Sequence, residues 1–248
     1  MKKTTAFIVT ATVLAFICMV LINANIASPR MHFFQQGNTV PVVKILKPKT
    51  DSVFAFNAPI AYNIVVTDKE DGDSRYDELN AKEILLKVAY SAAPVNVNIT
   101  NNGAITDAPG LAIMRTNNCF NCHAFNSKLI GPSFYDIVQK YTATAANIAQ
   151  VGKRVKDGST GIWGKVLMPT HPELTTAQAQ TIVDWILHYA AEAGTDYYVG
   201  TLGTFKLKPQ GSGNGVYVLT ASYIDHGVKA DSTKPRLEGS GVMVVRGR

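Results

Sequence analysis

Residues 119–123 read Cys-Phe-Asn-Cys-His, a C-x-x-C-H pattern. Two thiols three positions apart on a helical turn can reach both vinyl groups of one haem and form thioethers, and the adjacent histidine is then placed to bind the iron. A redox-active C-x-x-C favours a thioredoxin-like βαβ context, which does not surround this motif. A zinc site needs two further ligands at a paired spacing, and the downstream histidines are too far apart in the sequence for that: His171, His188 and His226. The pattern predicts one covalent haem c bound to Cys119 and Cys122, with His123 as a metal ligand.

An electron carrier also needs a second axial ligand to the iron. Thioether sulfur is the usual choice because it raises the reduction potential. Only Met168 and Met243 follow His123, and Met168 lies in Lys165-Val166-Leu167-Met168-Pro169. Most methionines are core residues, and His171 is a rival ligand three positions away. On residue type alone, these alternatives stay open.

The residues around the motif predict an all-α region. Residues 108–118 lead into the motif, and residues 133–141 and 143–156 follow it as two further helices, the second ended by Asp157-Gly158. Thr175 and Gln178 form a capping-box pattern for a last helix with one apolar stripe. Packed on the first helix, this last helix is expected to cover one edge of the haem. A loop over residues 161–172 is expected to carry Met168 across the opposite face.

Residues 105–192 resemble a short bacterial class I cytochrome c with one haem. The matching pieces, in order, are Cys119 to His123, Gly131-Pro132, Arg154, Gly158 to Gly164 with Trp163, Met168-Pro169, and the last helix with Trp185. The resemblance implies that Met168 is the distal ligand and that the Pro132 carbonyl accepts the other ring N–H of His123. It also implies that Arg154 and Trp163 approach the haem propionates. We expect a cytochrome c domain over residues 104–193.

The flanking residues have a different character, with period-two or apolar runs typical of strands. Four such runs precede the haem region, at 40–46, 53–56, 60–67 and 83–90, and three follow it, at 204–207, 216–224 and 242–246. Neither flank is large enough to bury a core alone, whereas seven strands in roughly 100 residues suit an immunoglobulin-like sandwich. The segments Pro41-Val42-Val43-Lys44-Ile45 and 214–221 also resemble strands of bacterial Ig-like modules.

The expected fold is therefore multidomain, α plus β. A discontinuous Ig-like β-sandwich over residues 38–92 and 200–248 holds the cytochrome between its fourth and fifth strands, with 93–109 and 191–200 as the crossings. The plainer alternative is two separate β segments, each packed on the cytochrome.

The first 24 residues predict export. A basic start at Lys2 and Lys3 precedes an uncharged apolar run over residues 6–22, which is the layout of a signal peptide. Residues 1–24 are expected to be cleaved, or residues 6–22 to stay as a membrane anchor. Either outcome places the rest in the periplasm. A net charge of +6 in 248 residues gives no case for nucleic-acid binding, and three cysteines cannot make a disulfide framework.

The segment 67–73 carries four carboxylates in six residues: Asp68, Glu70, Asp71 and Asp73. Clustered oxygen ligands in a turn can hold Ca²⁺, although the spacing departs from an EF-hand loop. The alternative, which we favour, is a solvated acidic turn between strands.

We expect a periplasmic electron carrier rather than an enzyme, with a periplasmic dehydrogenase or a terminal oxidase as the redox partner. A di-haem peroxidase needs a second C-x-x-C-H, which the sequence lacks, and no hydrolase constellation stands out. The alternative is a haem-bearing binding or sensor protein whose sandwich docks a partner or a polysaccharide. Exposed aromatic residues, with Tyr197 and Tyr198 as candidates, would favour that alternative.

Overall fold

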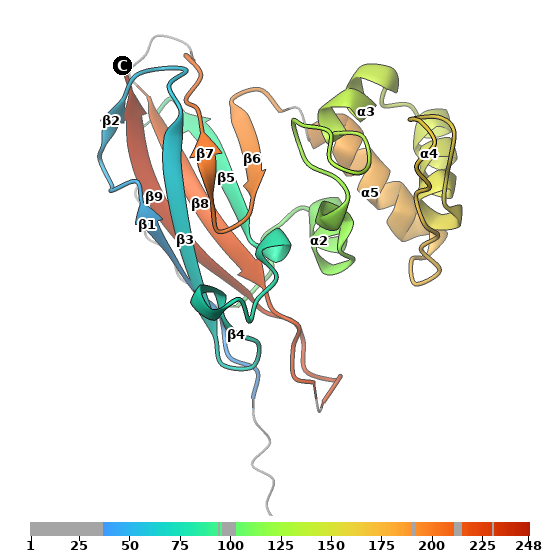
Figure 1. The fold of residues 1–248 in the computed structure, drawn as a ribbon, viewed down its shortest axis with the longest axis horizontal. Helices are drawn as coiled ribbons and strands as arrows, with labels where there is room; N and C mark the ends of the chain where they lie inside the picture. The colour runs from blue at the N-terminus through green and yellow to red at the C-terminus, as the bar shows by residue number, and fades with distance from the viewer. Residues whose placement is uncertain (1–36, 94, 96–102, 190–191, 211–214, 230) are drawn as a thin grey trace, which may run out of the picture. The chain divides into compact units, whose positions relative to one another are not determined.

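Two β-sheets and a group of α-helices make up the part of the chain that the computed structural model describes (Figure 1). The described residues are 37–248 without 94, 96–102, 190–191, 211–214 and 230. The predicted signal or anchor at 1–24 lies outside them. Among the helices in these ranges, none is long and apolar enough to cross a membrane.

The first sheet is built around the long strand β3 (Ile60–Asp68). β3 pairs antiparallel with β1 (Val42–Lys47), with the short β4 (Gly72–Asp73) and with β7 (Leu202–Phe205). Its burial alternates along the strand, because successive side chains of a strand point to opposite faces.

The second sheet has the order β2-β9-β8-β5-β6. Its strands are β2 (Val53–Phe54), β9 (Glu238–Gly247), β8 (Val216–Ile224), β5 (Leu85–Ser91) and β6 (Thr195–Val199). The β2–β9 pair is parallel, and the other pairs are antiparallel.

One apolar core lies between the two sheets, so the β region is a sandwich. β3 contributes Ile60, Tyr62, Ile64 and Val66, and the second sheet contributes inward residues of β5, β8 and β9, including Leu86, Val88, Leu219, Tyr223 and Val245. Strands from both ends of the chain therefore share one core, and the alternative of two separate β segments is wrong.

Along the chain, the helices lie between β5 and β6, which are hydrogen-bonded neighbours in the second sheet. The chain leaves after β5 and returns in β6, which pairs with β5 from Leu85↔Val199 to Ala89↔Thr195. The expected crossing over 191–200 is wrong, because Thr195–Val199 is a strand of the sandwich. β6 is short but rich in residues that favour strands, and it pairs along the edge that β5 offers.

Other strand boundaries shift where pairing outweighs local pattern. The structure adds β4, and the predicted strands at 204–207 and 242–246 are instead Leu202–Phe205 and Glu238–Gly247. β9 starts at residues of low β propensity, 238–241, because each pairs with a residue of β8. The predicted strand at 83–90 begins later, since Ala81–Glu83 forms a 3₁₀ turn (η2).

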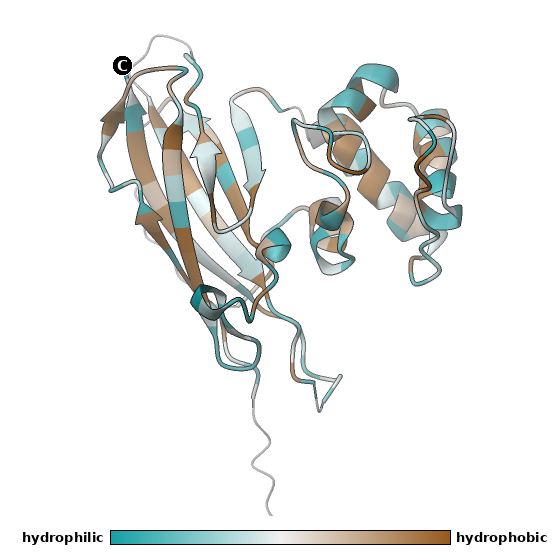
Figure 2. Cartoon of the chain, viewed as in Figure 1, coloured by the Kyte–Doolittle hydropathy of each residue, from teal (hydrophilic) through white to brown (hydrophobic). Residues whose placement is uncertain are grey.

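The predicted helices are confirmed, with small shifts of their ends. They are α2 (Pro109–Thr116), α3 (Phe134–Lys140), α4 (Ala145–Asp157) and α5 (Thr176–Tyr189). The capping box before α5 is present: Thr175 N donates to Gln178 Oε1 at 2.9 Å, and Gln178 N donates to Thr175 Oγ1 at 3.2 Å. Much of α5 is apolar (Figure 2), and its buried side chains pack against α2 and the haem-motif segment.

The sandwich and the helices share a second apolar core. Leu85 and Val199, paired across β5 and β6, join Tyr197 in packing against residues of the helical region such as Phe125, in the loop before α3, and Trp185 of α5. Residues 37–248 accordingly form one compact unit rather than two loosely tethered domains.

Candidate functional site

The C-x-x-C-H motif follows directly on α2. Asn118 adopts a left-handed conformation that turns the chain out of α2, and Cys119–Asn121 then forms a short 3₁₀ turn (η3). The backbone N–H groups of Cys122 and His123 both donate to the Cys119 carbonyl, at 3.2 and 3.0 Å. This turn places both thiols and the imidazole at one cavity. Cys119 and Cys122 are free thiols, and burial raises the pKa of Cys119 to about 12, so its sulfur is uncharged.

The ring of His123 is held from three sides. Its Nδ1 lies 2.8 Å from the Pro132 carbonyl oxygen, and Phe134 lies nearly parallel to it with ring centres 5.6 Å apart. Gly131 passes so close that a Cβ there would stand 2.4 Å from the ring, so only glycine fits. Burial lowers the pKa of His123, against the opposing effect of the Pro132 hydrogen bond. The ring is therefore neutral. Its Nδ1–H donates to the Pro132 carbonyl, which leaves the Nε2 lone pair available as a metal ligand.

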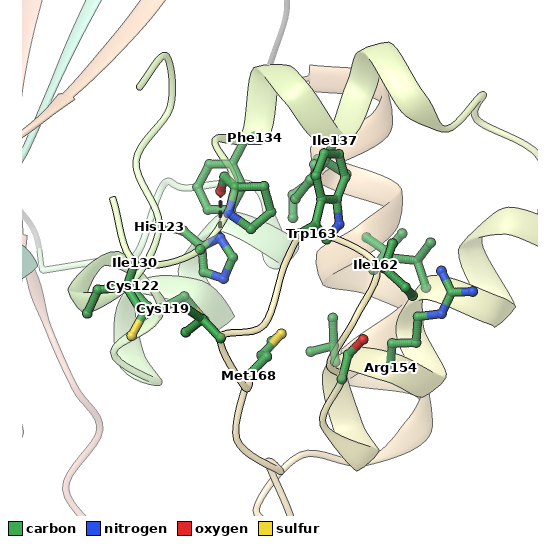
Figure 3. A pocket seen from close by; sticks show the side chains of 18 of the residues that line it. Cys119, Cys122, His123, Ile130, Phe134, Ile137, Arg154, Ile162, Trp163 and Met168 are labelled. Atoms are coloured by element: carbon green, nitrogen blue, oxygen red, sulfur yellow. Dashed lines mark hydrogen bonds between the residues drawn. The ribbon is translucent and has the colours of Figure 1, made fainter. Parts of the chain in front are cut away.

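Met168 reaches the cavity from a loop pinned at its base. Ser159 N donates to the Met168 carbonyl at 3.1 Å, and Met168 N donates back to Ser159 at 2.8 Å. Gly161 N donates to Gly164 O within the loop. Figure 3 shows the Met168 and His123 side chains extending into the same space from different segments.

All seven residues singled out from the sequence line this one cavity: Cys119, Cys122, His123, Pro132, Arg154, Trp163 and Met168 (Figure 3). The cavity holds about 1100 Å³ of empty space, its open mouth included. The rest of its wall is largely apolar, with Met114, Ile137, Val151, Ile182 and Ile186 among the lining residues.

Two cationic side chains lie beside aromatic rings of the cavity wall, Arg154 as a lining residue and Lys140 as an exposed neighbour of Trp163. Arg154 Nη1 donates to the Tyr141 hydroxyl at 2.9 Å, and the Lys140 ammonium lies 4.6 Å from the centre of the Trp163 ring. Sequence reasoning missed Tyr141, Lys140 and Phe134. They occupy ordinary helix or helix-end positions, and no local pattern distinguishes them.

The donor set fits a covalently attached haem. Two free thiols, a neutral imidazole and a thioether converge on one largely apolar cavity. The cations beside Tyr141 and Trp163 suit the two carboxylates of that group.

The rival ligand His171 does not line the cavity. Its Nδ1 lies 2.7 Å from Glu173 Oε1, and its backbone N–H donates to the Lys156 carbonyl. The Glu173 contact occupies only Nδ1, so what separates His171 from Met168 is that it is not among the residues lining the cavity.

The suggested calcium site is not supported. Within the described ranges, no group of three or more acidic, histidine or cysteine side chains is arranged to hold a metal. The carboxylates instead bind separate donors: Asp68 accepts from backbone N–H groups of residues 70 and 71, Asp73 pairs with Arg75, and Asp71 accepts from the Tyr223 hydroxyl. The strongly hydrophilic turn around β4 (Figure 2) includes part of this segment.

Tyr197 and Tyr198 are not the exposed pair that a glycan-binding face would need. Tyr197 is 6% exposed and stacks on Phe125, whereas Tyr198 packs against the sandwich core beside Tyr62. Their adjacent positions on a strand send them to opposite faces, and both faces are covered.

Comparison with known proteins identifies the helical region. Residues 108–190 match the family model of cytochrome c. Cytochrome c-551 of Azotobacter vinelandii is 37% identical over 78 residues, which are 32% of this chain and 94% of that protein. Cytochrome c-552 of Nitrosomonas europaea is 35% identical over 75 residues, 30% of this chain and 73% of the relative. The crystal structure of Nitrosomonas europaea cytochrome c552 aligns with 32% of this chain and 96% of its own, at 33% identity and a TM-score of 0.30. Through the region that carries its C-x-x-C-H motif, the chain belongs to the cytochrome c family.

Proposed function

We propose that this chain is a periplasmic c-type cytochrome that passes single electrons between redox partners through one covalently bound haem. The observation that carries the proposal is the convergence of Cys119, Cys122, His123 and Met168 on one apolar cavity. A haem bound there supplies a one-electron iron couple. Cys119 and Cys122 supply the two thioether sulfurs.

His123 and Met168 are proposed as the axial ligands. The Pro132 hydrogen bond and the contacts with Gly131 and Phe134 fix the His123 ring before any ligand is bound. The Ser159–Met168 bridge fixes the backbone that carries the sulfur. If His123 and Met168 both held the iron, the protein would leave no position on it for a substrate, which favours an electron carrier over a peroxidase.

Arg154 and Trp163 are proposed to face the haem propionates. The bond to Tyr141 holds the Arg154 guanidinium at the cavity wall. Lys140 adds a second positive charge beside Trp163. Burial of carboxylates at this end of the cavity is thereby compensated.

The sandwich is proposed to be of the immunoglobulin-like class, with the cytochrome inserted between two of its strands. Its pairings support this: β1, β3 and β7 correspond to A, B and E, and the order β9-β8-β5-β6 corresponds to G-F-C-C′. The insertion then replaces the C–C′ turn. Tyr197 is buried and Tyr198 is partly buried, so neither supplies the exposed aromatic face that would favour a polysaccharide-binding function.

Absorption spectra of the exported protein, produced with haem-attachment machinery, test the proposal. We expect a low-spin c-type spectrum with the weak red band of a methionine–ferric bond. Met168→Ala abolishes that band and opens the iron to carbon monoxide. His171→Ala is the matched control, because its ring is close in sequence but does not line the cavity, and it leaves the band intact. A high-spin wild-type spectrum, or loss of the band in His171→Ala instead, contradicts the proposed ligation.

A further inference from the structure

A continuous series of aromatic rings joins His123 to strand β6 of the sandwich. Phe134 lies nearly parallel to the His123 ring, with centres 5.6 Å apart. Phe125 meets Phe134 edge-to-face at 5.3 Å, and Tyr197 stacks on Phe125 at 4.9 Å with 19° between the ring planes. We call these four residues the aromatic row.

Tyr197 belongs to the sandwich, not to the region shared with other cytochromes c. It lies on β6, outside the matched residues 108–190. Nevertheless its ring is buried against the helical region, where Trp185 of α5 meets it edge-on at 5.8 Å, and the ammonium of Lys87 on β5 lies 5.8 Å from its ring centre. Phe125, Trp185 and Lys87 thus hold the Tyr197 ring in a defined position, stacked on Phe125.

A second cavity is lined in part by the same rings. His123, Phe120, Phe125 and Tyr197 are among its lining residues, together with residues of β7. It contains about 860 Å³ of empty space, open mouth included. Since this cavity already leads to the aromatic row, loss of the Tyr197 ring enlarges an opening beside His123.

We propose that Tyr197 is a positioning residue for the proximal ligand, acting through Phe125 and Phe134 on the orientation and hydration of His123. This rests on the proposed function, in which His123 binds the haem iron. The sandwich is then part of the shell that sets the reduction potential, in addition to anchoring the helices.

The sign of the effect follows from charge. The oxidised centre carries one more positive charge than the reduced one, and water stabilises charge better than packed rings do. Removing Tyr197 loosens Phe125 and Phe134 and admits water beside His123. The potential therefore falls, because exposure and ligand orientation are the levers by which a protein sets it.

Three variants of the full-length protein separate this role from simple stability. Tyr197→Leu removes the ring, Tyr197→Phe keeps the ring and removes the hydroxyl, and Leu85→Ala is the matched control. Leu85 is 3% exposed at the same junction, on the strand paired with β6, and it is not one of the four rings of the row. Redox titration gives the potential, and proton NMR of the reduced protein reports the His123 ring environment.

We expect Tyr197→Leu to lower the equilibrium constant for reduction by about tenfold, which is 59 mV for one electron, and to shift the His123 ring resonances. Tyr197→Phe stays within about twofold of the wild type on that scale, whereas Leu85→Ala lowers the melting temperature but also keeps the potential within about twofold. If Tyr197→Leu does not accumulate, Phe125→Leu interrupts the row from the cytochrome side with the same expected shift.

Equal shifts in Tyr197→Leu and Leu85→Ala, or no shift in either, overturn the proposal. A wild-type spectrum without the methionine–ferric band overturns the proposed Met168 ligation instead. Even in that case, the reduction potentials of the Tyr197 and Leu85 variants decide the proposal made for Tyr197.

Discussion

Arg115 is the residue whose loss should most damage the junction between the helices and the sandwich. It lies on α2, four residues before the haem motif, and its side chain is 1% exposed. Its guanidinium pairs with Asp107 at 2.5 Å and Glu238 at 3.6 Å and donates to Ser222 Oγ and O at 3.0 and 2.9 Å. A further bond, of 3.2 Å, goes to the Glu83 carbonyl. One side chain thus joins α2 to residues of three sandwich segments.

Arg115→Met keeps the apolar stem and removes the charge. Removing one partner of a buried ion pair costs about 3–5 kcal/mol, because the remaining charge is left uncompensated. Here two carboxylates, Asp107 and Glu238, lose their cation together, and burial already raises the pKa of Glu238. We therefore expect a loss near the upper end of that range. Adding Glu238→Gln should recover part of it, because contacting residues typically couple by about 0.5–3 kcal/mol.

Urea unfolding measures the loss, with fluorescence reporting the helical region and circular dichroism the whole fold. Both tryptophans of the chain, Trp163 and Trp185, lie in the helical region. Arg75→Met is the control: Arg75 also pairs with a carboxylate, but its side chain is 59% exposed, so its loss should cost less than about 1 kcal/mol. The reasoning is refuted if Arg115→Met costs no more than Arg75→Met.

Two further predictions concern packing and pH. Gly110→Ala places a Cβ 2.4 Å from that of Trp185, where α2 crosses α5, and should destabilise the protein by about 1–3 kcal/mol; an unchanged urea midpoint would argue against so close a crossing. His226 lies between Glu83 and Asp71, and its hydrogen bond to Glu83, with the charges of both carboxylates, raises the pKa of its imidazole. Because the folded pKa is the higher one, this stabilisation is complete below about pH 6.5 and is lost as pH rises through the raised pKa. His226→Gln should remove that step from melting temperatures measured between about pH 5 and pH 9, and a step of equal size in the variant would assign it to another group.

Short-range features could be predicted from the sequence. The haem-attachment turn, the capping box at Thr175 and the helices depend on residues within a few positions of one another, so local pattern suffices. The proposed distal ligand is less local: thioether sulfur is the usual choice and the resemblance implies Met168, but residue type alone leaves His171 open. In the structure Met168 lines the cavity, whereas His171 is not among its lining residues.

Acidic residues illustrate the opposite case. Four carboxylates in six residues indicate a possible cation site as long as their partners are unknown. The tertiary structure supplies those partners from distant segments, such as Tyr223 and His226 for Asp71. Donors more than 150 residues away cannot be recognised from the residues around Asp71.

By itself, the sequence determined the chemistry of the motif, the helices around it and the alternating strands of both flanks, since each is set by neighbours along the chain. Only the tertiary structure decided that β6 is a strand, that Tyr197 is buried against Phe125, and that Arg115 is buried between α2 and the sandwich. These features arise from pairing and burial between segments about 30 to more than 100 residues apart. The contacts that stabilise these features form only when the sheets have formed and the helices pack on them. A short stretch of sequence therefore does not reveal them.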